Sequence, residues 1–176
     1  MIENIILDAG HGNRDKGCSY GGYNEKDIAL SIVKNIAVRL HKPFLLTRYT
    51  DVFVSLKERC RIANENSPKI FVSVHCNAAP NLSAKGVEVW YYNHLGISKQ
   101  LAELFVNRLS LWSSRNRGIK KAYVDNKGIY VLKHTTCPAI LIEVGFLSSS
   151  EDREKLIDPF YQKVISCEIA KLLDIV

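Results

Sequence analysis

The sequence lacks the features of secreted, disulfide-stabilised or membrane-spanning proteins. Its five cysteines are odd in number and scattered, without a Cys-x-x-Cys pair, which argues against a disulfide framework and favours synthesis in a reducing cytoplasm. The amino terminus leads directly into a strand-like run without a basic segment and a long apolar stretch, so we expect no signal peptide. No apolar run approaches the roughly 18 residues of a membrane span. These absences predict a chain made in the cytoplasm without a transmembrane segment.

Internal repeats, low-complexity tracts and linker-like stretches are also missing. The 176 residues therefore predict one domain over residues 1–176, without a separate binding domain. A chain of this length buries roughly 70% of its unfolded surface, so it needs neither disulfides nor a structural metal to fold. A metal in this protein would serve chemistry.

The charge is unbalanced, with 24 Lys and Arg against 18 Asp and Glu and a net charge of +6. This favours an anionic partner, either nucleic acid or the acidic polymers of a bacterial wall. No dense basic run or aromatic-basic ladder occurs, and the basic segment Arg115–Lys121 is short, so no nucleic-acid partner is predicted. A solvated basic face that aids solubility explains the charge equally well.

Apolar runs and helix-capping patterns alternate along the chain. The runs predict six strands, over residues 5–7, 44–47, 70–74, 86–92, 129–132 and 139–142. Helical spacing and capping patterns predict helices over 25–40, 55–66, 98–112 and 158–173, and a short one from 148. Several strands are apolar on both faces. We therefore predict an α/β fold, with a mostly parallel, twisted central sheet of about six strands and helices on both faces.

Titratable side chains follow three of the predicted strands. His11 follows the first, His75 follows the run at 70–74, and Glu143 follows the run at 139–142, while Glu25 opens the first helix. Ligands of a parallel sheet bind at the carboxyl ends of its strands, so these four side chains should converge. Two imidazoles and one carboxylate, with a fourth position for water, form a recurrent catalytic zinc arrangement. A second carboxylate would then serve as general base.

Each of these residues also has a simpler explanation. A histidine that ends a strand is usually a hydrogen-bonded or surface residue. Glu25 could simply interact favourably with the positive end of its helix. Glu143 is harder to explain in this way, because a carboxylate directly after Ala-Ile-Leu-Ile is costly unless it is paired or bound to metal. Cys76 beside His75 suggests a thiolate ligand, but strand alternation points it to the other face.

Five segments together resemble the amidase-3 family, the zinc-dependent N-acetylmuramoyl-L-alanine amidases of bacteria and their phages. In the order of the family's motifs they are Leu7–Gly12, Glu25–Lys26, Ser73–Asn77, Gly86–Val89 and Leu141–Leu147. Ala9 and Asn13 depart from the proline and glycine that are usual at those two positions. The resemblance extends over nearly the whole chain.

The resemblance implies a zinc hydrolase of peptidoglycan that cleaves the amide between N-acetylmuramic acid and L-alanine. One Zn²⁺ per chain would be bound by His11, Glu25 and His75, and Glu143 would be the catalytic carboxylate. The substrate groove would include Asn77, Arg117 and Leu132.

Other functions remain open from the residues alone. The same chemistry suits a zinc endopeptidase or carboxypeptidase of the stem peptide, and a wall-binding module without catalysis is a further alternative. We expect a monomer that reaches the wall after release, as a phage endolysin does, or as an autolysin does on cell lysis. His41 and His94 are expected to be structural, whereas His134 is a weaker candidate for contact with substrate.

Overall fold

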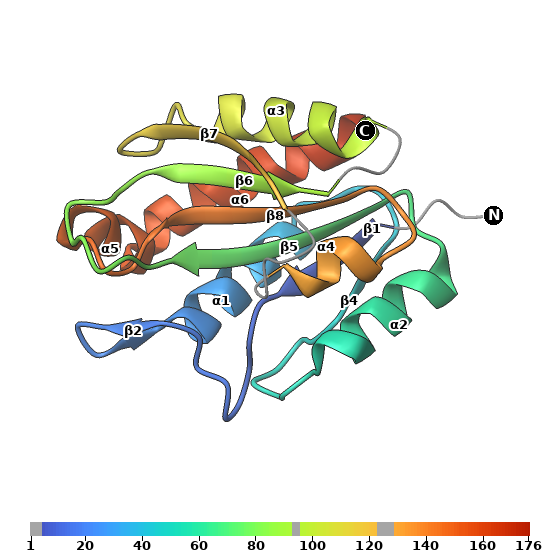
Figure 1. Ribbon diagram of the computed structural model, residues 1–176, viewed down its shortest axis with the longest axis horizontal. Helices are drawn as coiled ribbons and strands as arrows, with labels where there is room; N and C mark the ends of the chain where they lie inside the picture. The colour runs from blue at the N-terminus through green and yellow to red at the C-terminus, as the bar shows by residue number, and fades with distance from the viewer. Residues whose placement is uncertain (1–4, 93–95, 123–128) are drawn as a thin grey trace.

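A six-stranded sheet runs through the middle of the computed structural model, which describes residues 5–92, 96–122 and 129–176 (Figure 1). The strand order is β4-β1-β5-β8-β6-β7. These strands are β1 (Ile5–Ala9), β4 (Phe44–Leu46), β5 (Ile70–Asn77), β6 (Val87–Tyr91), β7 (Asn116–Lys121) and β8 (Ala139–Phe146). Strands β2 (Ser19–Tyr20) and β3 (Tyr23–Asn24) form a separate two-stranded hairpin.

The sheet is mostly parallel, as the sequence predicts. Strands β4, β1, β5 and β8 run in one direction, whereas β6 is antiparallel to β8 and β7 follows the direction of β6. The central strands are apolar on both faces because helices cover both sides; all five residues of β1 are buried. The carboxyl ends of β1, β5 and β8 therefore meet the start of β6 at one edge.

Six helices cover the two faces of the sheet unequally (Figure 1). They are α1 (Glu25–Ala37), α2 (Leu56–Asn66), α3 (Ile97–Leu109), α4 (Tyr130–His134), α5 (Ser150–Ile157) and α6 (Pro159–Ile175). The larger hydrophobic core lies under α1, α3 and α6. The smaller core lies on the opposite face, where α2 and the short α4 leave part of the sheet open.

Two predictions about the strands are wrong. Residues 130–134 form helix α4 instead of continuing a strand from Ile129, because a short apolar run does not distinguish a strand from a buried helical turn. The sixth strand is β7, which the sequence analysis did not predict. Its residues, Asn-Arg-Gly-Ile-Lys-Lys, form an edge strand whose polar composition gives little hydrophobic signal.

The helix boundaries follow capping chemistry. The Ser55 hydroxyl accepts a hydrogen bond from the Glu58 backbone N–H at the start of α2, and Asp158 caps α6 in front of a proline. At α5 the cap is Ser149, one residue later than predicted. Helix α3 ends earlier than predicted, so Trp112 is exposed, and Leu104 also faces solvent. No helix in the described ranges is long and apolar enough to cross a membrane.

Candidate metal centre

Three predicted ligands meet at the carboxyl edge of the sheet. The Oε1 atom of Glu25 lies 2.8 Å from Nδ1 of His75 and 3.0 Å from Nε2 of His11. One ligand atom from each residue lies within 4.8 Å of the other two. Within the described ranges this is the one group of three or more His, Cys, Asp or Glu residues with such spacing. The sequence therefore placed these three side chains together correctly.

Each ligand comes from a different element. His75 belongs to β5, Glu25 is the first residue of α1, and His11 lies in the loop after β1. The two rings meet edge to face, with centroids 4.9 Å apart. The loop turns sharply because His11 and Asn13 both adopt positive φ angles, of 61° and 52°. Asparagine tolerates this conformation better than most residues, which explains how Asn13 replaces the usual glycine.

A second layer of hydrogen bonds orients the ligands. Oδ1 of Asp15 lies 2.9 Å from Nδ1 of His11 and also accepts the Gly17 backbone N–H at 3.1 Å. The carboxylate of Glu25 accepts the backbone N–H groups of Cys18 and Cys76, at 2.9 and 3.1 Å. Such outer partners fix the orientation of metal ligands and raise the basicity of a ligating imidazole.

Electrostatics favour an anionic carboxylate between the two imidazoles. Burial raises the pKa of Glu25, but hydrogen bonds with His11 and His75 outweigh it and hold the pKa well below its usual range. Burial lowers the pKa of His11, and the hydrogen bond with Glu25 reverses this shift to a net increase. A divalent cation bound by the same nitrogen and oxygen atoms would replace the proton as the positive partner of Glu25.

This donor set fits zinc. Two imidazole nitrogens and one carboxylate oxygen are the protein ligands of many catalytic zinc sites. A thiolate ligand is disfavoured because burial raises the pKa of the Cys76 thiol well above its usual value. Cys76 itself packs in the hydrophobic core on the face opposite His75, as strand alternation predicts.

Two buried arginines hold the backbone of the His11 loop. Arg48 donates to the carbonyl oxygens of Ala9 and Gly10, at 2.9 and 2.8 Å, and also to that of Lys26 at 2.8 Å. Arg59 donates to the carbonyl oxygens of Ala9 and His11, at 2.7 and 2.6 Å. Neither arginine was identified from the sequence, because both lie in segments whose role depends on tertiary contacts.

The charge of Arg59 is balanced by Asp8 at the end of β1. The two side chains form an ion pair and are 3% and 1% exposed. Thr47 and Ser73 each donate a hydroxyl to Asp8 at 2.6 Å. Burial alone would raise the pKa of Asp8, but Arg59 and the two hydroxyls hold it below its usual value. Asp8 directly follows an apolar run, a signal the sequence analysis used for Glu143 but not here.

Glu143 lies beside the candidate ligands on the next strand. It is the register partner of His75 in β5 and of Glu88 in β6, so the three side chains project from the same face of the sheet. Its Oε2 atom is buried and has no hydrogen-bond partner in the described part of the chain. Burial raises the pKa of Glu143 well above its usual value, and the charges of Glu25 and Glu88 raise it further. The pKa of Glu143 is therefore raised, whereas that of Glu25 is lowered.

Glu88, in contrast, is fully hydrogen-bonded. Its carboxylate accepts from Asn77 at 2.9 Å, from the Trp90 indole at 3.0 Å and from Arg117 Nε at 2.8 Å. Two predicted groove residues, Asn77 and Arg117, therefore lie beside Glu143. Glu88 was not recognised from the sequence, although a carboxylate between Val87 and Val89 is the kind of buried charge that needs partners.

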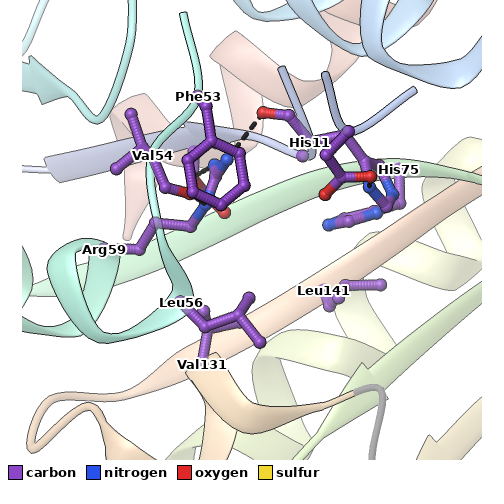
Figure 2. A pocket seen from close by; sticks show the side chains of 11 residues that line it. His11, Phe53, Val54, Leu56, Arg59, His75, Val131 and Leu141 are labelled. Carbon is purple, nitrogen blue, oxygen red and sulfur yellow. Dashed lines mark hydrogen bonds and ion pairs between the residues drawn. The ribbon is translucent and has the colours of Figure 1, made fainter. Parts of the chain in front are cut away.

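A cavity of about 360 Å³ opens on the other side of the two histidines (Figure 2). Phe53, Val54 and Leu56, from the segment leading into α2, form one wall. Val131 of α4 and Leu141 of β8 form another. The wall residues are apolar, so this side of the centre suits an uncharged part of a ligand.

Other predicted residues lie elsewhere. Leu132 is fully buried in the smaller core beneath α4, so the expected groove position is wrong: the residue sits in a helix and not at the end of a strand. His134 ends α4 and stacks on Tyr130, with ring centroids 4.0 Å apart. His41 lies beyond α1, which ends at Ala37, and pairs with Asp174. His94 lies outside the described residues.

Comparison with known proteins supports the same family along nearly the whole chain. The family model described as N-acetylmuramoyl-L-alanine amidase matches residues 5–174. The chain is 33% identical to the N-acetylmuramoyl-L-alanine amidase LytC of Bacillus subtilis over 91% of its own length and 32% of LytC. It is 36% identical to the endolysin of Bacillus phage SPP1, over 86% of this chain and 58% of the endolysin. The chain thus spans only part of the length of these two relatives.

Solved structures agree with the sequence relatives. An N-acetylmuramoyl-L-alanine amidase from Clostridium difficile 630 superposes with a TM-score of 0.89 at 34% identity, covering 97% of this chain and 94% of that one. The amidase AmiC2 of Nostoc punctiforme superposes with a TM-score of 0.88 at 35% identity, with the same coverage. With the match over residues 5–174, these comparisons show that the chain belongs to the amidase-3 family of N-acetylmuramoyl-L-alanine amidases.

Proposed function

We propose that this chain hydrolyses the amide bond between N-acetylmuramic acid and the L-alanine of the peptidoglycan stem. The observation that carries the proposal is the unpartnered, buried Oε2 atom of Glu143, one strand away from the His11, Glu25 and His75 cluster. A buried carboxylate without a hydrogen-bond partner is costly, so its retention at this position favours a role in proton transfer.

We propose one Zn²⁺ per chain, held by His11, Glu25 and His75. When bound, the ion supplies Lewis-acid chemistry, polarising the scissile carbonyl and lowering the pKa of a water molecule. Asp15 would keep the His11 ring in its ligating orientation. Glu25 would contribute the negative charge, in agreement with its depressed pKa.

Glu143 would transfer the proton. Its free Oε2 can accept a proton from the attacking water and then deliver it to the nitrogen of the leaving L-alanine. Burial raises the pKa of Glu143, which brings the group closer to the working pH at which a general base and acid is most effective. Its neighbours Asn77 and Arg117 would contact the substrate.

Two other functions are less well supported. A peptidase of the stem could use the same side chains, but the relatives at 33% and 34% identity carry the amidase name. A wall-binding module without catalysis would not need an unpaired buried carboxylate such as Glu143. The relative named an endolysin, from Bacillus phage SPP1, and the germination-specific amidase of Bacillus subtilis also support action on the cell wall.

The test combines product analysis with two carboxylate variants. Mass spectrometry of digested peptidoglycan should find intact stem peptides with a new L-alanine amino terminus and uncut glycan strands. Glu143→Gln should reduce kcat by about 10²–10⁴-fold and retain zinc, whereas Glu25→Gln should lose zinc. Glu103→Gln, a change of an exposed carboxylate on α3, is the matched control and should alter neither property.

Three outcomes would contradict the proposal. New amino termini at another stem residue, with the muramoyl amide intact, would favour the peptidase. Near-normal turnover of Glu143→Gln would remove Glu143 from the mechanism. Loss of zinc in Glu143→Gln together with its retention in Glu25→Gln would exchange the two carboxylate roles.

A further inference from the structure

Edge strand β7 carries a cationic hollow at the same end of the sheet. Arg115, Asn116, Arg117 and Lys120 line a cavity of about 270 Å³, which we call the β7 hollow. Neither the Arg115 guanidinium nor the Lys120 ammonium pairs with a carboxylate within residues 5–92, 96–122 and 129–176. The hollow thus carries two cations, on Arg115 and Lys120, that the described part of the protein does not neutralise, beside Arg117, which pairs with Glu88.

The register of the strands places Lys120 on the face that carries Glu143, whereas Asn116, the register partner of Val87, lies on the other face. Lys120 is the register partner of Trp90, and in-register neighbours project from the same face of a sheet. The Trp90 indole donates to Glu88, which is itself the register partner of Glu143. Because β7 lies two strands from β8, the hollow is about 10 Å from Glu143, from a strand spacing of about 4.8 Å.

Arg117 links the hollow to the centre. Its Nε donates to Glu88 at 2.8 Å, and its guanidinium lies over the Phe146 ring, 4.7 Å from the centroid. The two terminal nitrogens of Arg117 make no hydrogen bond in the described part of the chain, and the side chain is 29% exposed. Arg117 is therefore fixed at one edge while the other edge stays available to an anion.

The opposite flank of the centre has a different character. There the walls of the 360 Å³ cavity are formed mostly by apolar side chains, among them Phe53, Val54 and Leu56 (Figure 2). The charged residues that also line it are the mutually neutralised Asp8–Arg59 pair and Asp15, which contacts His11. One side of the candidate metal centre is thus mostly apolar and carries no unpaired cation in the described part of the chain, whereas the other is cationic.

We propose that the β7 hollow binds carboxylate groups of an acidic peptide and so sets the direction of the substrate. The peptide stem, which carries its carboxylates beyond the first alanine, would extend over β6 and β7. The uncharged sugar side would lie toward the apolar cavity beside α2 and α4. This inference rests on the proposed function, because it assigns the two halves of that substrate to the two flanks.

A competing explanation is that these cations only protect an exposed sheet edge. Lysine and arginine on an edge strand discourage pairing with other chains. The two explanations differ in what they predict for substrates. If the cations only protect the sheet edge, kcat/KM should not depend on a carboxylate on the stem. If the β7 hollow binds carboxylates, kcat/KM should depend on it.

The test compares two soluble substrates that differ in the two carboxylates of one residue. One is N-acetylmuramoyl-L-alanyl-D-glutamate, whose glutamate carries two free carboxylates, and the other is the same compound with both carboxylates converted to neutral amides. Arg115→Gln/Lys120→Gln should lower kcat/KM for the acidic substrate by on the order of tenfold, through several charge-assisted contacts. For the amide substrate, kcat/KM should change less than about twofold. Lys163→Gln removes one positive charge from an exposed position on α6 and is the control. It should leave kcat/KM for both substrates unchanged.

The outcomes separate this inference from the proposed function. Equal effects of Arg115→Gln/Lys120→Gln on both substrates, or no effect on either, would overturn the β7 hollow as a carboxylate site. If neither substrate is cleaved at the muramoyl bond, the proposed function fails. Calorimetry with the free peptide L-alanyl-D-glutamate then tests the carboxylate site independently of catalysis. The inference is supported if the acidic peptide binds more tightly than its amide and the double variant loses this difference. Equal binding of the two peptides would overturn it.

Discussion

The imidazole of His75 packs directly against Gly10, so that a β-carbon at position 10 would overlap all three ring atoms nearest to it. A glycine of the His11 loop thus shapes the position of another candidate ligand, on β5. The two glycines that flank His11 have different functions. Gly12 permits the tight turn, with a φ of 138°, whereas Gly10 leaves room for the His75 ring.

Gly10→Ala should therefore weaken metal binding. The added methyl group must displace the His75 ring, and disturbing the support of a ligand typically costs about 10–100-fold in metal affinity. Competition with a chromophoric chelator would measure the change. Gly22→Ala is the control: the φ of 84° strains an alanine there locally, but its β-carbon meets no atom within 4 Å, so zinc affinity should not change. Unchanged affinity in Gly10→Ala would show that His75 is not a ligand or can move freely.

Arg48 should be a positioning residue for the metal centre. Its guanidinium joins the carbonyl oxygens of Ala9 and Gly10 to that of Lys26, and thereby ties the His11 loop to the first turn of α1, which begins with Glu25. A lysine cannot donate in all these directions, and each unsatisfied buried carbonyl costs about 1–3 kcal/mol.

Arg48→Lys should therefore lower both the free energy of unfolding and the zinc affinity. Arg39→Lys is the control, since the hydrogen bonds of the Arg39 guanidinium within the described ranges go to Asn35 of α1. Denaturant titration of the metal-free protein and chelator competition would separate the two effects. A variant that loses stability but keeps full zinc affinity would show that Arg48 supports the fold alone.

The sequence predicted the fold class and the convergence of four side chains because both depend on local patterns. Runs such as Ile70–Val74 show buried strands, and a parallel sheet brings their carboxyl ends to one edge. Once that edge is drawn, His11, His75 and Glu143 must be neighbours. Glu25 joins them because α1 begins at the same edge.

Residues that act through long-range contacts could not be predicted in the same way. Arg48 and Arg59 come from segments 39 and 50 residues beyond Ala9, and only the folded chain shows that their guanidinium groups reach its carbonyl oxygen. Strand β7 is similar, because its polar residues are held by pairing with β6 and not by burial. The prediction for Leu132 was wrong because of an ambiguous local pattern: four apolar residues suit a strand and a helical turn equally well.

Asp8 should make the stability of the protein depend on acid pH. Its folded pKa lies below the unfolded value of 3.8, so its contribution is fully present above that pH and is lost as the pH falls through the folded pKa. Asp8→Asn leaves Arg59 buried without its partner, which should cost about 3–5 kcal/mol near neutral pH.

The difference between wild type and Asp8→Asn should begin to narrow below about pH 3.8, where the carboxylate of the unfolded chain takes up a proton, and should be lost below the lower pKa of the folded protein. Urea unfolding at a series of pH values would measure it. Glu58→Gln removes an exposed ion pair with Arg61 and serves as the control, with little change expected at any pH. A constant difference down to the acid limit would mean that Asp8 is not the titrating group.

Removal of the metal should abolish activity without unfolding the protein. The two hydrophobic cores are formed by residues of the sheet and helices, and His11, Glu25 and His75 lie at the edge of this packing. A chelator should leave the circular dichroism spectrum unchanged, and added zinc should restore turnover. Zinc should also raise the melting temperature, because a ligand that binds only the folded state stabilises it in proportion to RT ln(1 + [L]/Kd).

In His75→Ala both responses to zinc should disappear, whereas His134→Ala, which removes an exposed ring on α4, should retain them. Full activity in a verified metal-free sample would exclude the proposed zinc mechanism, and unfolding on chelation would show that the metal is structural.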